Sequence, residues 1–211
     1  KGRMSGRWRH KCLPGLAYLL LAIAMPSDAA PSKAASGVQP YITLTFPRTE
    51  LGSYCLIKPS TSYTNDLRIS DYKPARGSVN IPADSKISLK LGYNVHSNIR
   101  ELKEISKQAV RYLDLSKMEI DNAEFQDLLH FTDLVSLDMG STEIDDAGTI
   151  GLRNLTKLQN LNVGFCPIGL GTVEEISHLK ELLRLTFASN TLGDKAGPML
   201  AKLKKLQVLV L

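Results

Sequence analysis

The stretch L-V-S-L-D-M-G-S-T-E-I, residues 134–144, recurs with substitutions at residues 158–168 and 182–192, which defines a 24-residue period in the second half of the chain. Its opening position is held by Val110, Leu134, Leu158, Leu182 and Leu206. Three positions later every copy has a leucine, at Leu113, Leu137, Leu161, Leu185 and Leu209. Two positions further on, each copy has an apolar residue: Leu115, Met139, Val163, Phe187 and Leu211. A fixed period of this length predicts stacked repeats rather than a closed core.

Each unit begins with a strand pattern. In the second unit Leu137 and Met139 alternate with Ser136, Asp138 and Gly140. Alternation with a period of two is typical of a short strand that has one buried face. Neighbouring units are then expected to pair their strands in a parallel ladder, about 4.8 Å apart.

The second half of each unit changes period and predicts a helix. In residues 145–157 the apolar side chains Ala147, Leu152 and Leu155 fit a helical stripe, with Asp145 or Asp146 as the N-cap. The third unit has the spacing of a capping box at residues 172–175, Thr-Val-Glu-Glu.

Apolar columns should run through the stack. The three predicted columns are Ile120, Ile144, Ile168 and Leu192; Leu128, Leu152, Ile176 and Leu200; and Phe131, Leu155, Leu179 and Leu203. About seven inward apolar positions per unit, at ~1.5–3 kcal/mol each for full burial, offset much of the ordering entropy of a unit.

These features resemble the leucine-rich repeat family. The pattern L-x-x-L-x-L-x-x-N/C/T-x-I/L appears at residues 134–144, 158–168 and 182–192, and its ninth position holds Met118, Thr142, Cys166 and Asn190. The Asp-Asp-Ala-Gly and Asp-Lys-Ala-Gly turns at 145–148 and 194–197 are similar to the ribonuclease-inhibitor-like, cysteine-containing and related bacterial subtypes. The resemblance covers residues 110–211. It implies an α/β leucine-rich repeat solenoid with a parallel β-sheet on the concave side, helices on the convex side, and protein or glycan ligands.

The N-terminal residues predict export. From Met4 the chain has a basic segment followed by an apolar run at positions 13–24. Small residues ending at Ala24 and at Ala29 offer two cleavage positions, so residues 1–30 are predicted to be a signal peptide. The apolar run is shorter than the ~20 residues of a membrane span, although an uncleaved anchor is the alternative. Residues 1–3 are interpreted as lying upstream of the true start, and residues 31–40 as a linker.

Residues 41–109 are predicted to form a small β region and a degenerate capping repeat. Strand alternation occurs around Leu44, around Tyr54 and before and after a turn at residues 82–85. Counting back one repeat length from the first unit places Leu89, Leu91 and Asn94 at the fourth, sixth and ninth repeat positions. The alternative is a separate β domain joined to the repeats.

The last residues would leave an apolar surface open. Leu206, Leu209 and Leu211 are expected to face the core, with no helix after them. We interpret the chain as a fragment truncated in its fifth unit. The rival interpretation is a complete protein whose open end is covered by another subunit.

Charge and cysteines exclude several classes of function. The formal net charge is +5, but residues 1–30 hold five basic residues against one aspartate, which leaves the rest of the chain near +1. This charge does not predict nucleic-acid binding. Beyond the signal, Cys55 and Cys166 are the two cysteines, and they are expected to be buried, unbridged thiols because a disulfide tolerates only ~6 Å between Cα atoms.

Two side-chain groups are candidates for chemistry. His130 and His178 occupy one repeat position two units apart, about 10 Å by strand spacing, which is too far to share a zinc ion. Asp114 and Asp138 occupy adjacent outward positions, close enough for a paired-carboxylate site and for one pKa to rise. A ligand or cation contact, or an ordinary polar surface, are the alternatives. No phosphate loop, Cys-x-x-Cys pair or nucleophile elbow occurs, so we expect no catalytic residue, no metal and no cofactor.

The remaining candidate is the concave strand surface. The candidate partner-binding residues are Tyr112, Asp114, Ser136, Asp138, Asn160, Asn162, Phe165, Arg184 and Thr186. Five strands give a flat area on the order of 240 Å², against about 800 Å² per partner in a standard interface.

Three hypotheses of function follow from these patterns. The first is an exported, non-catalytic scaffold that binds a protein or glycan, not nucleic acid, in the periplasm, outside the cell or on its surface. The second is a targeting module of a larger enzyme whose catalytic domain lies beyond Leu211. The third is a structural spacer of the cell envelope.

Overall fold

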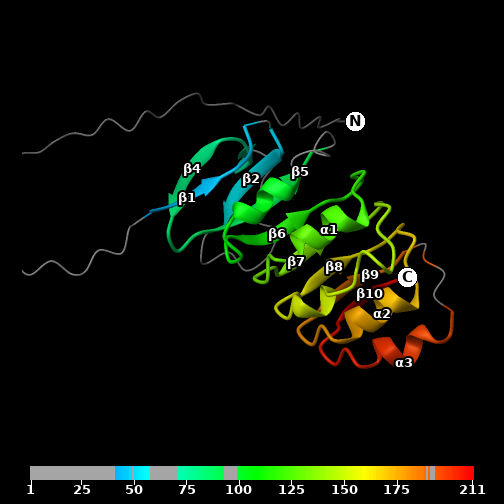
Figure 1. Cartoon of the computed structure of the whole chain (residues 1–211). Coiled ribbons are helices and arrows are strands. Elements are labelled where there is room, and N and C mark those ends of the chain that lie inside the picture. The colour runs from blue at the N-terminus through cyan, green and yellow to red at the C-terminus, as the bar shows by residue number, and fades with distance from the viewer. Residues whose placement is uncertain (1–40, 49, 58–70, 93–98, 189, 191–192) are drawn as a thin grey trace, which may run out of the picture. The chain divides into compact units, whose positions relative to one another are not determined.

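The computed structural model describes residues 41–48, 50–57, 71–92, 99–188, 190 and 193–211, all within one compact unit, Gln39–Leu211 (Figure 1). The predicted signal and linker, Asn94 and Leu192 lie outside the described residues. The β-strands are β1 (Tyr41–Thr45), β2 (Gly52–Ile57), β3 (Lys73–Pro74), β4 (Ser78–Pro82), β5 (Lys86–Leu91), β6 (Val110–Asp114), β7 (Ser136–Asp138), β8 (Asn160–Asn162), β9 (Arg184–Thr186) and β10 (Val208–Val210). The helices are η3 (Ile99–Glu104), α1 (Asn122–Leu128), η4 (Leu152–Asn154), α2 (Leu170–Ser177) and α3 (Ala196–Leu200), of which η3 and η4 are 3-10 helices.

The strands of the repeating units form a parallel sheet. Its order is β10-β9-β8-β7-β6-β5-β2-β3, with β5 to β10 parallel and β2 and β3 antiparallel. The central leucine of each strand pairs with that of the next, from Leu113 through Leu137, Leu161 and Leu185 to Leu209. The predicted register is therefore confirmed without a slip. A slip of one residue would turn every leucine to the solvent face, so burial specifies this register.

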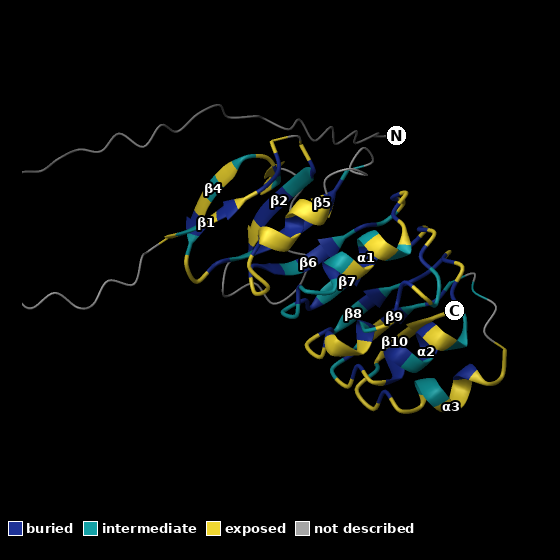
Figure 2. Ribbon diagram, in the orientation of Figure 1, coloured by how far each residue is buried: buried dark blue, intermediate teal, exposed yellow. Residues whose placement is uncertain are grey.

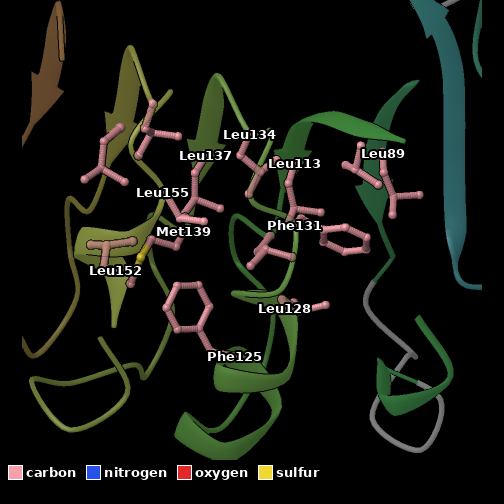
Figure 3. Packing of buried hydrophobic residues seen from close by; sticks show 14 of the residues in the cluster. Leu89, Leu113, Phe125, Leu128, Phe131, Leu134, Leu137, Met139, Leu152 and Leu155 are labelled. Atoms are coloured by element: carbon pink, nitrogen blue, oxygen red, sulfur yellow. The ribbon is translucent and has the colours of Figure 1, made fainter. Parts of the chain in front are cut away.

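The leucines of the strands pack against the helical side of each unit. Leu113 and Leu137 point toward Phe125, Phe131 and Leu155 (Figure 3), and all five side chains are at most 3% exposed. The described members of the three predicted columns are buried, except the half-buried Leu200. One continuous apolar core thus fills the space between the sheet and the helices.

The ninth position satisfies backbone carbonyl groups at the corner after each strand. Thr142 Oγ1 donates to Met139 O at 2.8 Å, and Cys166 Sγ donates to the same oxygen at 3.1 Å. Asn190 Nδ2 donates to Val163 O and Phe187 O at 3.0 and 3.1 Å. These carbonyl groups lie where the chain turns, and they lack a backbone N–H partner among the described residues. The short side chain at the ninth position donates the hydrogen bond instead. Cys55 and Cys166 are buried free thiols, as expected.

The helical side departs from the predicted pattern in the second unit. Residues 145–157 form turns and the three-residue 3-10 helix η4, not an α-helix. Gly151 has a φ of 93°, in the left-handed region, which interrupts a right-handed helix. Leu152 and Leu155 are fully buried, whereas Ala147 is exposed. The apolar spacing is therefore real but is produced by consecutive turns.

The predicted capping box at residues 172–175 is wrong. Helix α2 begins earlier, with Gly169 as an N-cap that provides no side-chain hydrogen bond, and Thr172 lies buried inside the helix. A capping box is present instead in α1. There Asp121 Oδ1 accepts from Glu124 N at 2.7 Å, and Glu124 Oε2 accepts from Asp121 N at 3.1 Å.

Helix α2 is capped by the preceding unit. The carboxylate of Asp146 accepts four hydrogen bonds, from Gly169 N at 2.7 Å, Gly171 N at 3.0 Å, Thr172 N at 2.9 Å and Thr172 Oγ1 at 2.7 Å. A Cβ atom on Gly171 would stand 2.8 Å from Asp146 Oδ2, so glycine permits this approach. Burial raises the pKa of Asp146, but the hydrogen bonds outweigh it and lower the pKa below the usual value.

A second carboxylate makes the reverse connection. Glu175 in α2 is 8% exposed and accepts hydrogen bonds from Gly151 N and Arg153 N of the preceding unit, each at 3.1 Å. It also pairs with the Arg153 guanidinium at 2.6 Å. Burial raises the pKa of Glu175, but the Arg153 contacts outweigh it and lower the pKa. The second and third units therefore cap each other.

The N-terminal region extends the sheet. Leu89 in β5 pairs with Leu113 in β6, as counting back one repeat length predicts. The turn at residues 82–85 is present, with Ser85 N donating to Pro82 O at 2.9 Å. It connects strands of different sheets, because β4 pairs with β1 and β5 pairs with β2 and β6.

The far edge of the sheet is apolar. Val208, Leu209, Val210 and Leu211 are 37%, 41%, 44% and 76% exposed (Figure 2). Leu209 and Leu211 are therefore uncovered, as the sequence predicts, whereas Leu206 is half-buried.

Candidate functional site

The candidate surface is the face of strands β6 to β9 that lies opposite the leucines; we call it the open face. Two rows of side chains cross it. One row holds Tyr112, Ser136, Asn160 and Arg184, and the other holds Asp114, Asp138, Asn162 and Thr186. The period of two along each strand brings these side chains together, as the sequence predicts.

Tyr112 is not available for binding, contrary to its prediction as a candidate contact. Its side chain is 4% exposed and forms a small apolar cluster with Ile57 and Val135. Ile57 belongs to β2, which lies on the far side of β5 from β6. The β2 end of the open face is therefore covered, and the usable surface is limited to the strands that follow β6.

Asp114 is engaged by its neighbours. Its Oδ1 accepts from Ser116 N at 2.9 Å and Ser116 Oγ at 2.7 Å, and its Oδ2 pairs with Lys90 Nζ at 2.9 Å. Burial raises the pKa of Asp114, but the hydrogen bonds from Ser116 and Lys90 outweigh it and lower the pKa. This carboxylate is thus held ionised and oriented toward the turn after its own strand.

Asp138 has the opposite titration behaviour. Its Oδ1 accepts from Gly140 N at 2.9 Å and Asn162 Nδ2 at 3.0 Å. Burial raises the pKa of Asp138, and the charge of Asp114 on the adjacent strand adds to the rise. The prediction that one pKa of this pair rises agrees with Asp138 in direction, although burial is the main cause and the charge of Asp114 a smaller one. The two carboxylates are fixed by separate turns, each through a backbone N–H two positions later in the chain.

A shallow hollow lies over β7, β8 and β9. Its volume is about 510 Å³. The hollow is lined by Ser136, Leu137, Asp138, Asn160, Leu161, Asn162, Leu183, Arg184, Thr186 and Gln207. The sequence predicts a flat surface here, whereas the structure has this shallow hollow. The sequence prediction also misses Leu183 and Gln207, which occupy the same repeat position directly before the strand.

Arg184 is the cation of this hollow. It is exposed and forms no ion pair with any residue in the described ranges. The hollow also contains neutral amide and hydroxyl groups and the carboxylate of Asp138, which accepts a hydrogen bond from Asn162 Nδ2. The hollow therefore offers an available guanidinium among hydrogen-bonding groups, which suits a polar ligand.

Phe165 lies in the turn after β8, outside the residues that line the hollow. Its side chain is 63% exposed, and its φ of 60° places it in the left-handed region. Ser141 and Lys117 adopt the same backbone conformation one and two units earlier, with φ values of 59° and 62°. The turn therefore demands this conformation, and a bulky side chain there is strained. Its exposure is compatible with its prediction as a candidate partner-binding residue.

The described histidines His130 and His178 contact backbone carbonyl groups, and His130 Nε2 also lies 3.4 Å from Ile105 O. His130 Nδ1 bonds Asp127 O at 2.7 Å, and His178 Nδ1 bonds Glu174 O at 2.8 Å. Within the described ranges, no group of three His, Cys, Asp or Glu side chains could hold a metal ion. No described helix combines the length and the apolar character needed to cross a membrane.

The comparisons with known proteins give little beyond this geometry. No protein-family model and no curated protein matches the sequence. Among solved structures, an internalin from Listeria monocytogenes is similar, with 25% identity and a TM-score of 0.47. The match covers 53% of this chain and 31% of the internalin, so the chain spans less than a third of that protein. At that TM-score the likeness establishes neither fold nor function.

The register and the packing define the class. The chain is a mixed α/β protein in which successive 24-residue segments each add one strand to a parallel sheet.

Proposed function

We propose that this chain is a leucine-rich repeat solenoid that acts as a non-catalytic binding scaffold. The observation that carries the proposal is the polar hollow of about 510 Å³ over β7 to β9, which is lined by available Arg184 among other polar residues. Phe165, in the turn after β8, adds an exposed aromatic side chain. Concave, partly preformed sites with a few placed polar groups are typical of ligand binding. Aromatic and arginine side chains are enriched among the residues that dominate binding energy.

The ligand we favour is a protein, and a glycan is the alternative. A protein ligand would place an apolar contact on Phe165 and hydrogen bonds on Asn160, Asn162 and Thr186. Strands β7 to β9 are short, with three residues each. The surface they offer is smaller than the ~800 Å² per partner of a standard interface. We therefore expect a weak contact, or a contact that also uses residues outside these strands.

Export is part of the same proposal. The basic and apolar pattern of residues 4–24 supports a secretory signal with cleavage after Ala24 or Ala29. N-terminal sequencing of the protein recovered outside the cytoplasm tests it. A new N-terminus near either alanine supports export with cleavage, and recovery in the cytoplasm with residues 4–30 intact contradicts it.

The binding proposal is tested by substitution on the open face. Surface proteins and a glycan array are screened with the full chain, and each captured ligand is measured by biolayer interferometry. Asn162→Arg and Phe165→Ala should weaken the interaction tenfold or more. The matched control is Ala147→Arg, which adds the same charge as Asn162→Arg at an exposed site on the helical side.

Each outcome separates two hypotheses. Equal binding by Asn162→Arg, Phe165→Ala and Ala147→Arg contradicts a ligand site on the open face and favours the spacer. A reading frame that continues beyond Leu211 into a domain with catalytic residues favours the targeting module of a larger enzyme.

A further inference from the structure

A second groove lies beside the hollow, where the chain enters strands β6, β7 and β8. Its volume is about 290 Å³. It is lined by Lys86, Arg111, Asp133, Val135, Lys157, Gln159 and Glu181. None of these residues belongs to the proposed ligand surface on the open face, so the groove raises a separate question of function.

The charges in the groove do not cancel. Asp133 is shared by two lysines, with its Oδ2 3.8 Å from Lys86 Nζ and its Oδ1 in contact with Lys157 Nζ. Glu181 is neutralised from outside the groove by Lys205, at 2.7 Å. Two lysines against one aspartate leave one positive charge, and Arg111 adds another.

Arg111 is the group that this arrangement leaves unused. Its Nε is buried and has no hydrogen-bond partner among the described residues. A buried donor without a partner costs about 1–3 kcal/mol, more when the group is charged, so native structures rarely retain one without a reason. No described residue forms an ion pair with this guanidinium.

The backbone presents Arg111 in an irregular position. Between β5 and β6 the register passes from Ile87↔Val110 to Ser88↔Tyr112, so Arg111 is an extra residue without a partner on β5. Extra residues of this kind re-aim a side chain and are common next to functional sites. The equivalent positions of the next two units hold Val135 and Gln159, so the cation is specific to this strand.

We propose that this groove binds a compact oxyanion, a phosphate or carboxylate group, with Arg111 as its principal ligand. The guanidinium fork matches the geometry of either group and supplies the Nε donor that is otherwise unpaired. Lys157 and the Gln159 amide complete the contact. Asp133 lies in the same groove and opposes the anion, and its two lysines offset that repulsion. The site does not depend on the open-face ligand.

The test is an NMR titration of the full chain at constant ionic strength. It observes the Nε–H signal of Arg111 in the wild type and, in the wild type and every variant, the backbone amide signals of residues 111, 135 and 159. One arm adds inorganic phosphate, and the other adds N-acetylglutamate. The expected result is a saturable shift of the Arg111 signal with at least one of the two. Tighter binding of phosphate identifies a phosphorylated ligand, and tighter binding of N-acetylglutamate identifies an acidic side chain.

Variants decide whether Arg111 carries the site. Arg111→Gln should weaken binding about tenfold or more, since charged hydrogen bonds are lost, and Arg111→Lys should lie between Arg111→Gln and the wild type. Arg76→Gln removes the same charge from an exposed loop and should leave the affinity unchanged. Unaltered phosphate and N-acetylglutamate affinities in Arg111→Gln, or shifts spread over surface lysines without movement of the Arg111 signal, overturn the proposal. If Arg111→Gln does not fold, Arg111→Lys and the wild-type titration give the answer.

Discussion

Replacing Asp146 by alanine tests how strongly one repeat depends on its neighbour. The substitution removes the acceptor of all four hydrogen bonds at the start of α2. Loss of an N-cap costs ~0.5–2 kcal/mol, and a hydrogen bond to a charged group contributes about 1.5–3 kcal/mol. Because Thr172 is fully buried, water cannot easily replace the lost acceptor. We expect Asp146→Ala to lower the free energy of unfolding by about 2–4 kcal/mol.

The contribution of Asp146 to the free energy of unfolding depends on pH, and the sign of this dependence follows from the direction of its pKa shift. The pKa of folded Asp146 lies below its usual value of 3.8. A carboxylate of this kind stabilises the protein at pH values above the unfolded pKa, and the contribution is lost as the pH falls through the folded pKa. Asp146→Asn should therefore cost less than Asp146→Ala at pH 7, and its difference from the wild type should shrink as the pH falls below 4.

The assay is urea unfolding followed by circular dichroism at pH 7 and at pH 3, with amide hydrogen exchange read at Gly169, Gly171 and Thr172. Glu143→Ala is the matched control, because it removes one negative charge from an exposed residue three positions earlier in the chain. It should change the free energy of unfolding by no more than about 0.5 kcal/mol. Equal costs for Asp146→Ala and Glu143→Ala, or unchanged exchange at the three amides, would refute the capping role.

Three further predictions concern other described contacts. Glu175→Gln should lower the free energy of unfolding by about 1–3 kcal/mol. Arg153→Gln should lower it by less, because the guanidinium is exposed to solvent; a larger cost for Arg153→Gln in urea unfolding contradicts this order. Phe165→Gly should raise the free energy of unfolding by about 1 kcal/mol and the melting temperature by about 2–4 °C, because glycine tolerates the left-handed conformation. A lower melting temperature in scanning calorimetry would contradict this and mean that the ring contributes to packing. Asp138→Asn should raise the free energy of unfolding at pH 7 but not at pH 3. The pKa of folded Asp138 is raised, so its ionisation lowers the stability of the wild type as the pH rises through that pKa. An equal effect of the substitution at both pH values in urea unfolding contradicts the burial argument.

The sheet could be predicted from the sequence because its determinants are local and repeated. Each unit places a leucine such as Leu137 at the same position, and burial of that one row specifies the register of all neighbouring strands. The ninth-position residues Thr142 and Cys166 were recognisable for the same reason, since each acts on a carbonyl group at its own corner.

Features that depend on another unit could not be predicted in this way. Asp146 was expected to begin a helix in its own unit, but it caps α2 of the next one. The apolar pattern of the second unit predicts a helix, but Gly151 has a positive φ, which interrupts a right-handed helix. The sequence does not reveal that conformation. Tyr112 is not available to a ligand because Ile57, from a strand distant in the sequence, packs against it.

The groove around Arg111 illustrates the same limit. In the sequence Arg111 is one polar residue between two apolar ones, and its repeat position suggests nothing unusual. Its significance depends on the register change against β5 and on the unpaired Nε. Both are properties of the assembled sheet, so no pattern within a unit could indicate them.

The mutual capping by Asp146 and Glu175 limits how these units could be copied or exchanged. Suppose that residues 134–157 were duplicated in tandem. The first Asp146 would then face the second copy's Asp145-Asp146-Ala147-Gly148 segment where the native chain has Gly169, Leu170, Gly171 and Thr172. A carboxylate would approach two others, and the duplicate would lack the glutamate that serves Gly151. Lengthening this array by gene duplication would therefore require compensating changes at the new junction, and a recombinant cassette should keep residues 146–175 together.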